Sequence, residues 1–263
     1  MARSALLNVM VQAVSKAGRS LSRDFNEVEN LQVSLKGPGD FVSVADTNAE
    51  NILKKELNKA RPGYSFLMEE GGEIKTSSDY RWIIDPLDGT TNYLHSIPFF
   101  AVSLALEHKG ELIAGVIYNP ATEDLFTAEK GNGAFANDRR MRVANRRAFD
   151  ECVIATGIPA LNKKGHRVPL LEQREIMMRA AGVRATGSAA LNLAYLAAGR
   201  FDGYWEAGLQ PWDVAAGMLM VREAGGFVSE PSPKGSIYES GRIIAGNQFV
   251  HGELRKIIDQ KRD

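Results

Sequence analysis

The chain has 263 residues, of which 44% are hydrophobic and 24% charged, ordinary values for a globular protein with a sizeable core. Its 32 basic residues balance 32 acidic ones, so no global charge draws it to nucleic acid or an anionic membrane. The single cysteine, Cys152, excludes an internal disulfide, and we expect a buried thiol in a reducing compartment.

The N-terminal half predicts two helices and then mainly β structure. Apolar residues recur at helical spacing over residues 3–24, and the polar residues between them argue against a signal peptide. A second helix is expected after Asp46, with Thr47 and Glu50 as its capping box and residues 62–63 as its end. Strands are then predicted at YSFLMEE (64–70), at RWIID (81–85) and, three times with turns between them, from 99 to 136.

The C-terminal half predicts helices that alternate with short strands. The helices are expected at about 166–181, 188–198, 212–224 and 248–261. The strands are expected at DGYWE (202–206), GGFVS (225–229) and RIIAG (242–246). This mixture predicts an α/β protein of layered sheets and helices, built as one domain with halves of about 1–145 and 146–263. No stretch is long enough to span a bilayer, and we expect a cytoplasmic protein without a membrane partner.

Two acids, Asp85 and Asp88, stand where the apolar run of WIIDPLDGTTN (82–92) gives way to a turn. On its own, this pattern is typical of a strand-to-helix corner with a capping residue. Glu69, Glu70 and Asp213 also stand at a strand end or a helix start, positions that meet at the ligand-binding edge of α/β sheets. Clustered buried carboxylates repel one another unless cations neutralise them, and an oxygen-only ligand set favours Mg²⁺ over zinc.

The residues after Asp88 favour a phosphate site. If a helix begins near Thr90, its free N–H groups attract an anion, and Gly89 lets a phosphate approach the backbone. Acids for Mg²⁺ beside amides for phosphate predict metal-assisted hydrolysis of a phosphate ester. GNGAFA (131–136) fits a dinucleotide-binding pattern, but a hairpin turn is expected because no helix follows it. No metal-ligand spacing relates the histidines, His95, His108, His166 and His251.

Several motifs lie far apart along the chain: the acid pair 69–70, WIIDPLDGTTNY (82–93), PWDVAAGMLMVREAGG (211–226), Lys36 with DFVSVAD (40–46), KGNGAF (130–135), RATGSAALN (184–192), GRFDGYWEAGL (199–209) and IIAGN (243–247). In this order they resemble the inositol monophosphatase family, in particular its bacterial SuhB-type members. The resemblance covers nearly the whole chain. It implies an αβαβα layered sandwich of the inositol monophosphatase and fructose-1,6-bisphosphatase type. Three departures, Met68, Gly71 and Tyr93, replace the family's frequent Gly, Ser and Phe without removing a ligand.

The resemblance also implies roles for individual residues. Two or three Mg²⁺ ions are expected: one on Glu69, Asp85 and the Leu87 carbonyl, a second on Asp85, Asp88 and Asp213, and a weaker third that Glu69 helps to place. Asp46 and Thr90 would orient and help deprotonate the attacking water. Phosphate and alcohol would contact Leu87, Asp88, Gly89, Thr90, Thr91, Arg184, Gly187, Ser188, Ala189, Glu206 and Asp213. Lys36 would lie on a mobile loop over the site.

These features predict a Mg²⁺-dependent phosphatase of small phosphate monoesters, with inositol 1-phosphate as the expected substrate. The resemblance adds inhibition by lithium and a homodimer. Fructose-1,6-bisphosphatase or nucleotide 3′-phosphatase activity is an alternative that needs further basic residues, for which Arg184 and Lys36 are candidates. A second alternative is a SuhB-type role in binding RNA or a transcription complex, supported by the arginines of NDRRMRVANRR (137–147), although a solvated hairpin edge also accounts for that segment.

Overall fold

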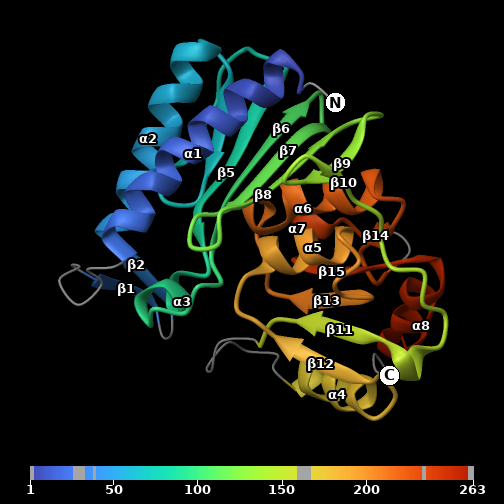
Figure 1. Ribbon diagram of the computed structural model, residues 1–263. Coiled ribbons are helices and arrows are strands. Elements are labelled where there is room, and N and C mark those ends of the chain that lie inside the picture. The colour runs from blue at the N-terminus through green and yellow to red at the C-terminus, as the bar shows by residue number, and fades with distance from the viewer. Residues whose placement is uncertain (1–2, 26–32, 38–39, 159–166, 233–234, 260–263) are drawn as a thin grey trace.

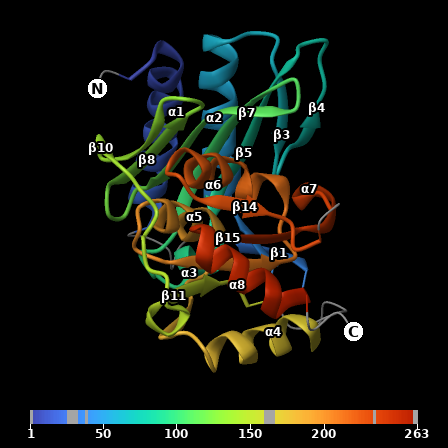
Figure 2. The same cartoon turned by 90° about the vertical axis from the view of Figure 1, so that its right-hand side faces the viewer.

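The computed structural model describes residues 3–25, 33–37, 40–158, 167–232 and 235–259, with the backbone alone at 33–37, 40–42 and 167–169. Helices and sheets alternate in five layers (Figures 1 and 2). In order, the layers are helices α1 (Ala5–Phe25) and α2 (Val44–Ala60), a large sheet, helices α5 (Ala189–Ala197) and α6 (Pro211–Glu223), a small sheet, and helices α4 (Arg167–Met177) and α8 (Gln248–Asp259). The predicted αβαβα sandwich is confirmed.

The large sheet is antiparallel except for one pair among its described strands. Its spatial order is β10 (Arg139–Arg140), β9 (Gly133–Ala136), β8 (Asp124–Glu129), β7 (Glu111–Asn119), β6 (Ala101–His108), β5 (Tyr80–Asp88), β3 (Ser65–Met68) and β4 (Gly72–Ile74). Strands β3 and β5 run parallel, with Met68 beside Ile84. Their carboxyl ends therefore share one edge, and the Glu69 N–H donates to the Ile84 carbonyl at 3.2 Å.

Strand β5 is apolar without alternation because both of its faces are covered. Trp82 and Ile84 pack among the residues of α1 and α2, whereas Ile83 packs on the opposite side, among those of α5 and α6. Successive side chains of a strand point to opposite faces, so a strand between two helical layers needs hydrophobic residues at every position. All three are at most 1% exposed, which fixes the register of the strand and hence the position of Asp85 just beyond them.

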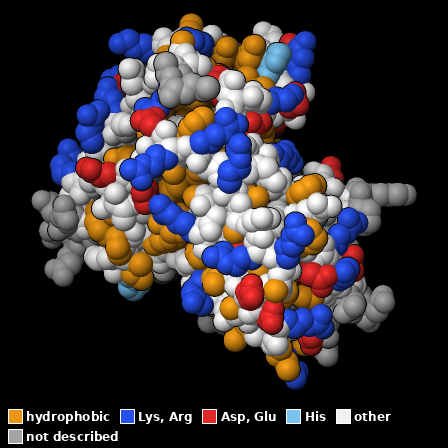
Figure 3. All heavy atoms as spheres, turned by 45° about the vertical axis from the view of Figure 1, so that its right-hand side comes forward, with side chains coloured by type: hydrophobic (Ala, Val, Ile, Leu, Met, Phe, Trp, Pro, Cys, Tyr) orange, Lys and Arg blue, Asp and Glu red, His pale blue; other side chains and the backbone are white. Residues whose placement is uncertain are grey.

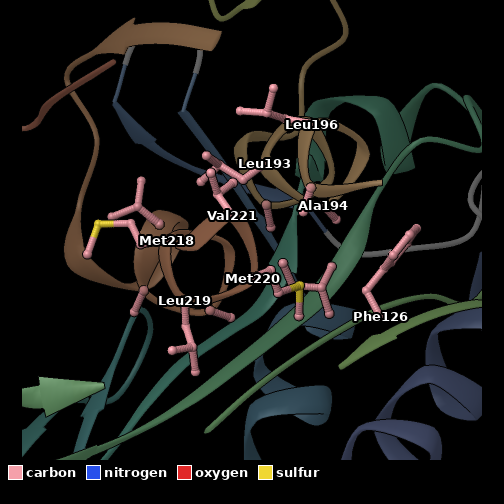
Figure 4. Close-up of a cluster of buried hydrophobic side chains, with 14 of the residues drawn as sticks. Phe126, Leu193, Ala194, Leu196, Met218, Leu219, Met220 and Val221 are labelled. Atoms are coloured by element: carbon pink, nitrogen blue, oxygen red, sulfur yellow. The ribbon is translucent and has the colours of Figure 1, made fainter. Parts of the chain in front are cut away.

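The small sheet has the order β12 (Gly182–Ala185), β11 (Val153–Thr156), β13 (Gly203–Ala207), β15 (Arg242–Gly246) and β14 (Phe227–Ser229). Strand β11 runs parallel to β12 and β13, and β13 runs antiparallel to β15. Between the sheets, α5 and α6 form the central core together with β8, part of which Figure 4 shows. The two helices approach closely at Gly217, where a Cβ would lie 2.4 Å from that of Leu193.

The start of helix α2 differs from the sequence expectation, whereas helix α3 (Thr90–Leu94) begins at Thr90 as expected. Helix α2 begins at Val44, and its capping box joins Ser43 and Asp46 in place of Thr47 and Glu50, because Asp46 accepts from the Ser43 N–H. Helix α3 has only five residues, so its macrodipole is small. The remaining described elements are the β1 (Val33–Gly37) and β2 (Asp40–Ser43) hairpin, η2 (Phe149–Glu151) and α7 (Ile237–Ser240).

Other predictions about the chain hold. Cys152 is buried, and the GNGAFA segment forms a turn that leads into β9. Tyr93, at a position where a Phe is frequent in the family, donates its buried hydroxyl to the Leu21 carbonyl at 3.0 Å and so ties α3 to α1. Within the described residues, no helix combines the length and apolarity that crossing a membrane requires.

Candidate active site

Asp85 and Asp88 lie on either side of an irregularity in β5. In a regular strand, residues three apart point to opposite faces. The pairing with β6 shifts between Asp85, opposite Ser103, and Asp88, opposite Ala101, and this bulge resets the alternation. Asp85 is 1% exposed and accepts a hydrogen bond from the Leu87 N–H at 2.9 Å. The apolar strand and the bulge together therefore bring both carboxylates to one place.

Two further acids reach the same place from other elements. Glu69 follows β3 directly, and its backbone is bonded to Ile84, next to Asp85. Asp213 lies in the first turn of α6, where its carboxylate accepts from the Gln210 N–H at 2.7 Å. The Ser103 hydroxyl, opposite Asp85, donates to the Trp212 carbonyl at 3.4 Å and so fixes the start of α6 beside β5.

Burial and then crowding raise the pKa values of three of these acids, Asp85, Asp88 and Asp213. Burial raises the pKa of Asp85 well above its usual value, and repulsion from Glu69, Asp88 and Asp213 adds to the effect. Burial and then repulsion from Asp88 likewise raise the pKa of Asp213. For Asp88, burial raises the pKa to about 6 in spite of three hydrogen bonds that favour the ionised form. A cation bound among these groups would remove the repulsion.

The donor set fits a hard cation, since it consists of carboxylates together with the Leu87 carbonyl. No three Asp, Glu, His or Cys side chains of the described ranges are already arranged as a compact metal cage. Backbone amides and a hydroxyl hold the carboxylates instead: Leu87 N–H on Asp85, Gln210 N–H on Asp213, and the start of α5 on Asp88. The described residues therefore fit a hard cation through the chemical type of their oxygen ligands, and not through a preformed cage.

The turn after Asp88 is shaped by Gly89. Its φ of 92° is left-handed, and a Cβ there would lie 3.1 Å from the Phe99 carbonyl and 3.2 Å from that of Gly187. The Thr90 hydroxyl lies within hydrogen-bonding distance of two acceptors, Asp46 Oδ1 at 3.1 Å and the Leu87 carbonyl at 3.0 Å. Because α3 is so short, an anion at this turn would depend on local N–H groups and not on a helix dipole.

Helix α2 contributes two buried acids, Asp46 and Glu50, and the sequence analysis had assigned Glu50 to the capping box of the helix. Burial raises the pKa of Asp46, the N3 residue of α2. One helical turn further on, Glu50 is buried and accepts from the Glu70 N–H at 2.9 Å, so it supports the turn that carries Glu69. The spacing of four residues places both acids on one face of the helix. The four-residue spacing in the sequence could have shown that Glu50 lies beside Asp46, but the sequence analysis assigned Glu50 to the capping box.

The two halves of the chain meet at Asp88. Its carboxylate accepts from the Ser188 hydroxyl, from the Ala189 N–H at 3.3 Å and from the Ala190 N–H at 2.7 Å, and so it caps α5. Asn92, which the sequence analysis did not single out, donates to both the Phe99 and Thr186 carbonyls at 2.7 Å. The turn after Asp88 and the turn before α5 are thus bonded together.

Glu206, which the resemblance assigns to the contact with the alcohol, lies on β13. It accepts a hydrogen bond from the Tyr204 hydroxyl at 2.6 Å. Burial, and then repulsion from Asp88, raises the pKa of Glu206 to about 7, against the effect of that hydrogen bond. Glu206 is therefore near enough to Asp88 to interact with it electrostatically.

Arg184, Lys36 and the histidines make contacts of other kinds or lie outside the described residues. Arg184 is exposed on the edge strand β12, and its guanidinium donates to the neighbouring Val183 carbonyl at 3.1 Å. Lys36 lies within strand β1 and not on the expected loop, and its side chain is outside the described part of the structure. His108 stacks on Tyr80, His251 bonds to Ser229, and His166 lies outside the described residues.

Comparison with known proteins gives consistent results. The model of the inositol monophosphatase family matches residues 2–262. Inositol-1-monophosphatase of Mesorhizobium japonicum is 60% identical, over 98% of this chain and 97% of its own length. Nus factor SuhB of Escherichia coli is 41% identical, over 98% and 97%. The crystal structure of extragenic suppressor protein suhB from Bartonella henselae has a TM-score of 0.95 and 58% identity, over 98% of this chain and 99% of that one.

Proposed function

The chain belongs to the inositol monophosphatase family, and on that premise we propose that it hydrolyses inositol 1-phosphate to inositol and phosphate with the help of Mg²⁺. The observation that carries the proposal is the convergence of Glu69, Asp85, Asp88 and Asp213 beside the turn at 89–91. Relatives named Inositol-1-monophosphatase support the choice of substrate. We also propose that residues 1–263 form one domain, since both halves supply the acids.

The metal would be held by the carboxylates. Glu69, Asp85 and the Leu87 carbonyl would form one position, Asp85, Asp88 and Asp213 a second, and Glu69 would help to form a weaker third. When bound, the cations would neutralise these acids and act as Lewis acids on the phosphoryl and leaving oxygens. This proposal explains why the fold tolerates acids whose burial and mutual repulsion raise their pKa values.

The chain's own groups would handle the attacking water. The Thr90 hydroxyl lies within hydrogen-bonding distance of Asp46 Oδ1. It can therefore accept a proton from water while it donates its own proton to that carboxylate. The raised pKa of Asp46 makes its carboxylate a better proton acceptor than an exposed aspartate. The N–H groups of the turn at 89–91 would orient the phosphate, because Gly89 has no side chain to obstruct it.

The alcohol would be recognised from the second half of the chain. Asp88, Glu206 and Asp213 offer acceptors for hydroxyl groups, and the backbone at Ala189 and the 187–188 turn complete the pocket. A polyhydroxylated leaving group can use these acceptors, whereas an aryl group cannot. Glu206 should therefore matter more for the proposed preference for inositol than for the release of phosphate itself.

Phosphate release from a substrate panel tests the proposal. The panel contains inositol 1-phosphate, fructose 1,6-bisphosphate, adenosine 3′,5′-bisphosphate and an aryl phosphate, each with Mg²⁺, with lithium added, and with chelator. We expect the highest kcat/KM on inositol 1-phosphate, inhibition by lithium, and no release in chelator. A preference for either bisphosphate would favour the alternative substrates, for whose second phosphate the exposed Arg184 is a candidate contact. Light scattering would test the proposed homodimer, and cell fractionation the proposed cytoplasmic location.

A second candidate, a role in a transcription complex, is favoured by the similarity to Nus factor SuhB of Escherichia coli. The arginine segment gives it limited support. Arg146 pairs with the buried Asp202 at 2.8 Å, and Arg147 stacks over Phe249, so both stabilise the fold. Arg139 and Arg140 remain exposed, and on the face in Figure 3 basic side chains are interspersed with acidic ones. Salt-sensitive RNA retention that is lost in Arg139→Ala/Arg140→Ala would support this role, and unchanged retention would not.

A further inference from the structure

Glu206 is surrounded by two groups to which no role has been assigned, Gly157 and Tyr204. Gly157 follows strand β11, which runs parallel to β13 with Thr156 beside Trp205. The next residue along each strand brings Gly157 beside Glu206. A Cβ at Gly157 would lie 1.8 Å from Glu206 Oε1 and 2.5 Å from Oε2, far inside van der Waals contact.

The space at Gly157 is therefore occupied by the carboxylate of Glu206. Gly157 is not among the residues with a left-handed φ, so its backbone would accept another residue. The requirement for glycine comes from the carboxylate alone. Any side chain at this position would displace Glu206 from the place that it holds.

Tyr204 holds the same carboxylate from the other side. It is two residues from Glu206 on β13, so both side chains point to the same face of the sheet. Tyr204 is fully buried, and its hydroxyl donates to Glu206 Oε2 at 2.6 Å. Its ring packs in the core around α5 and α6, which fixes the position of the hydroxyl. Burial raises the pKa of Tyr204 well above its usual value, so the phenol stays a donor throughout the working range.

We propose that Gly157 and Tyr204 determine specificity for polyhydroxylated alcohols by fixing where the Glu206 carboxylate meets the hydroxyls of the leaving group. The inference rests on the proposed function and adds two positioning residues to it. Tyr204 restrains one oxygen, and Gly157 leaves room for the carboxylate. An acceptor that is held in place loses less freedom on binding a hydroxyl, and it discriminates more strongly against a substrate without one.

The test compares kcat/KM for inositol 1-phosphate with kcat/KM for 4-nitrophenyl phosphate, each with Mg²⁺. Tyr204→Phe removes one hydrogen bond and should lower the ratio of the two values about fivefold to tenfold. Gly157→Ala should lower the ratio at least as much, because it displaces the carboxylate. Both variants should leave hydrolysis of the aryl phosphate nearly unchanged. Adding Gly157→Ala to Glu206→Gln should change the ratio no further, since both act through one group.

Matched controls separate positioning from packing. Tyr93→Phe also removes a buried phenol hydrogen bond, and Gly252→Ala adds a methyl group where no atom outside the adjoining turns of its own helix lies within 4 Å. Neither should change the ratio. Equal losses on both substrates in Tyr204→Phe, or an unchanged ratio, would overturn the inference even if Gly157→Ala did not fold. If the unaltered protein hydrolysed neither substrate, the proposed function would fail and the specificity role with it.

Discussion

Asp88→Asn separates the role of this residue in folding from its proposed role in catalysis. Burial raises the pKa of Asp88 from 3.8 to about 6. A raised pKa in the folded state means that the protein loses stability as the pH rises from about 4 through about 6, and above that range the loss stays. A shift of this size corresponds to about 3 kcal/mol, and we take about 2 kcal/mol because Asp88 is partly exposed.

Asparagine removes this penalty but also removes an acceptor. The carboxylate receives the Ser188 hydroxyl and the N–H groups of Ala189 and Ala190. An amide has one accepting oxygen. Protonated Asp88 likewise has one strong accepting oxygen, and the pKa of about 6 is already the net effect of burial and these hydrogen bonds, so their loss is not a separate cost. In chelator at pH 8 the variant should therefore be more stable by about 2 kcal/mol and melt about 4–8 °C higher than the unaltered protein. At pH 4, where Asp88 is protonated, the two proteins should melt at nearly the same temperature.

Activity should respond very differently. If Asp88 holds Mg²⁺ and contacts the substrate, Asp88→Asn should lower kcat at least about 100-fold and raise the Mg²⁺ concentration that is required. Asp202→Asn is a suitable control, because Asp202 is also buried and accepts from a backbone N–H, that of Val153, but has no role in the proposed site. It should lower the melting temperature and leave kcat unchanged. Near-normal turnover of Asp88→Asn across a Mg²⁺ titration would refute the metal-ligand assignment.

Metal removal, pH and thiol reactivity give three further predictions. Chelation should abolish phosphate release, Mg²⁺ should restore it, and Ca²⁺ should inhibit through its larger coordination shell; activity in chelator would contradict the metal site. Burial raises the pKa of Glu206 from 4.5 to about 7. The free energy of unfolding of the chelated protein should therefore fall by about 1–3 kcal/mol as the pH rises from 4.5 to 7. Denaturant titrations should show a smaller fall for Glu206→Gln. Burial also raises the pKa of Cys152 to about 11, so a thiol reagent should label it only on unfolding, and rapid labelling of the native protein would disagree.

The sequence predicts the layers and most of the acids because these depend on local patterns. The apolar run before Asp85 identifies a strand between two helical layers, and an acid directly after such a strand lies at the edge of the sheet where ligands bind. The start of α2 was misplaced because two capping patterns four residues apart were available. Asp46 was thus taken to precede the helix, whereas it lies in the first turn, where it accepts from both Ser43 and Thr90.

Long-range contacts account for what the sequence could not predict. Asn92 reads as an ordinary turn residue, and its bond to Thr186 joins positions 94 residues apart. The opposition of Gly157 and Glu206 depends on the register of two parallel strands, which local periodicity does not specify. The family resemblance implied a loop for Lys36, and the structure instead places it in a strand that pairs with β2.

The cap that Asp88 provides for α5 has a consequence for synthesis of the chain. During translation, every strand of the large sheet is made before residue 188, so until α5 and α6 emerge from the ribosome nothing of α5 binds the Asp88 carboxylate, Asp213 is missing, and one face of the sheet is uncovered. The nascent N-terminal half therefore carries a crowded pair of acids without the donors or the partner acid that the finished protein supplies. Competence arises only when the last third of the polypeptide docks, so a truncated product that ends before α6 would be inert, and a cell would gain no premature hydrolysis from unfinished chains.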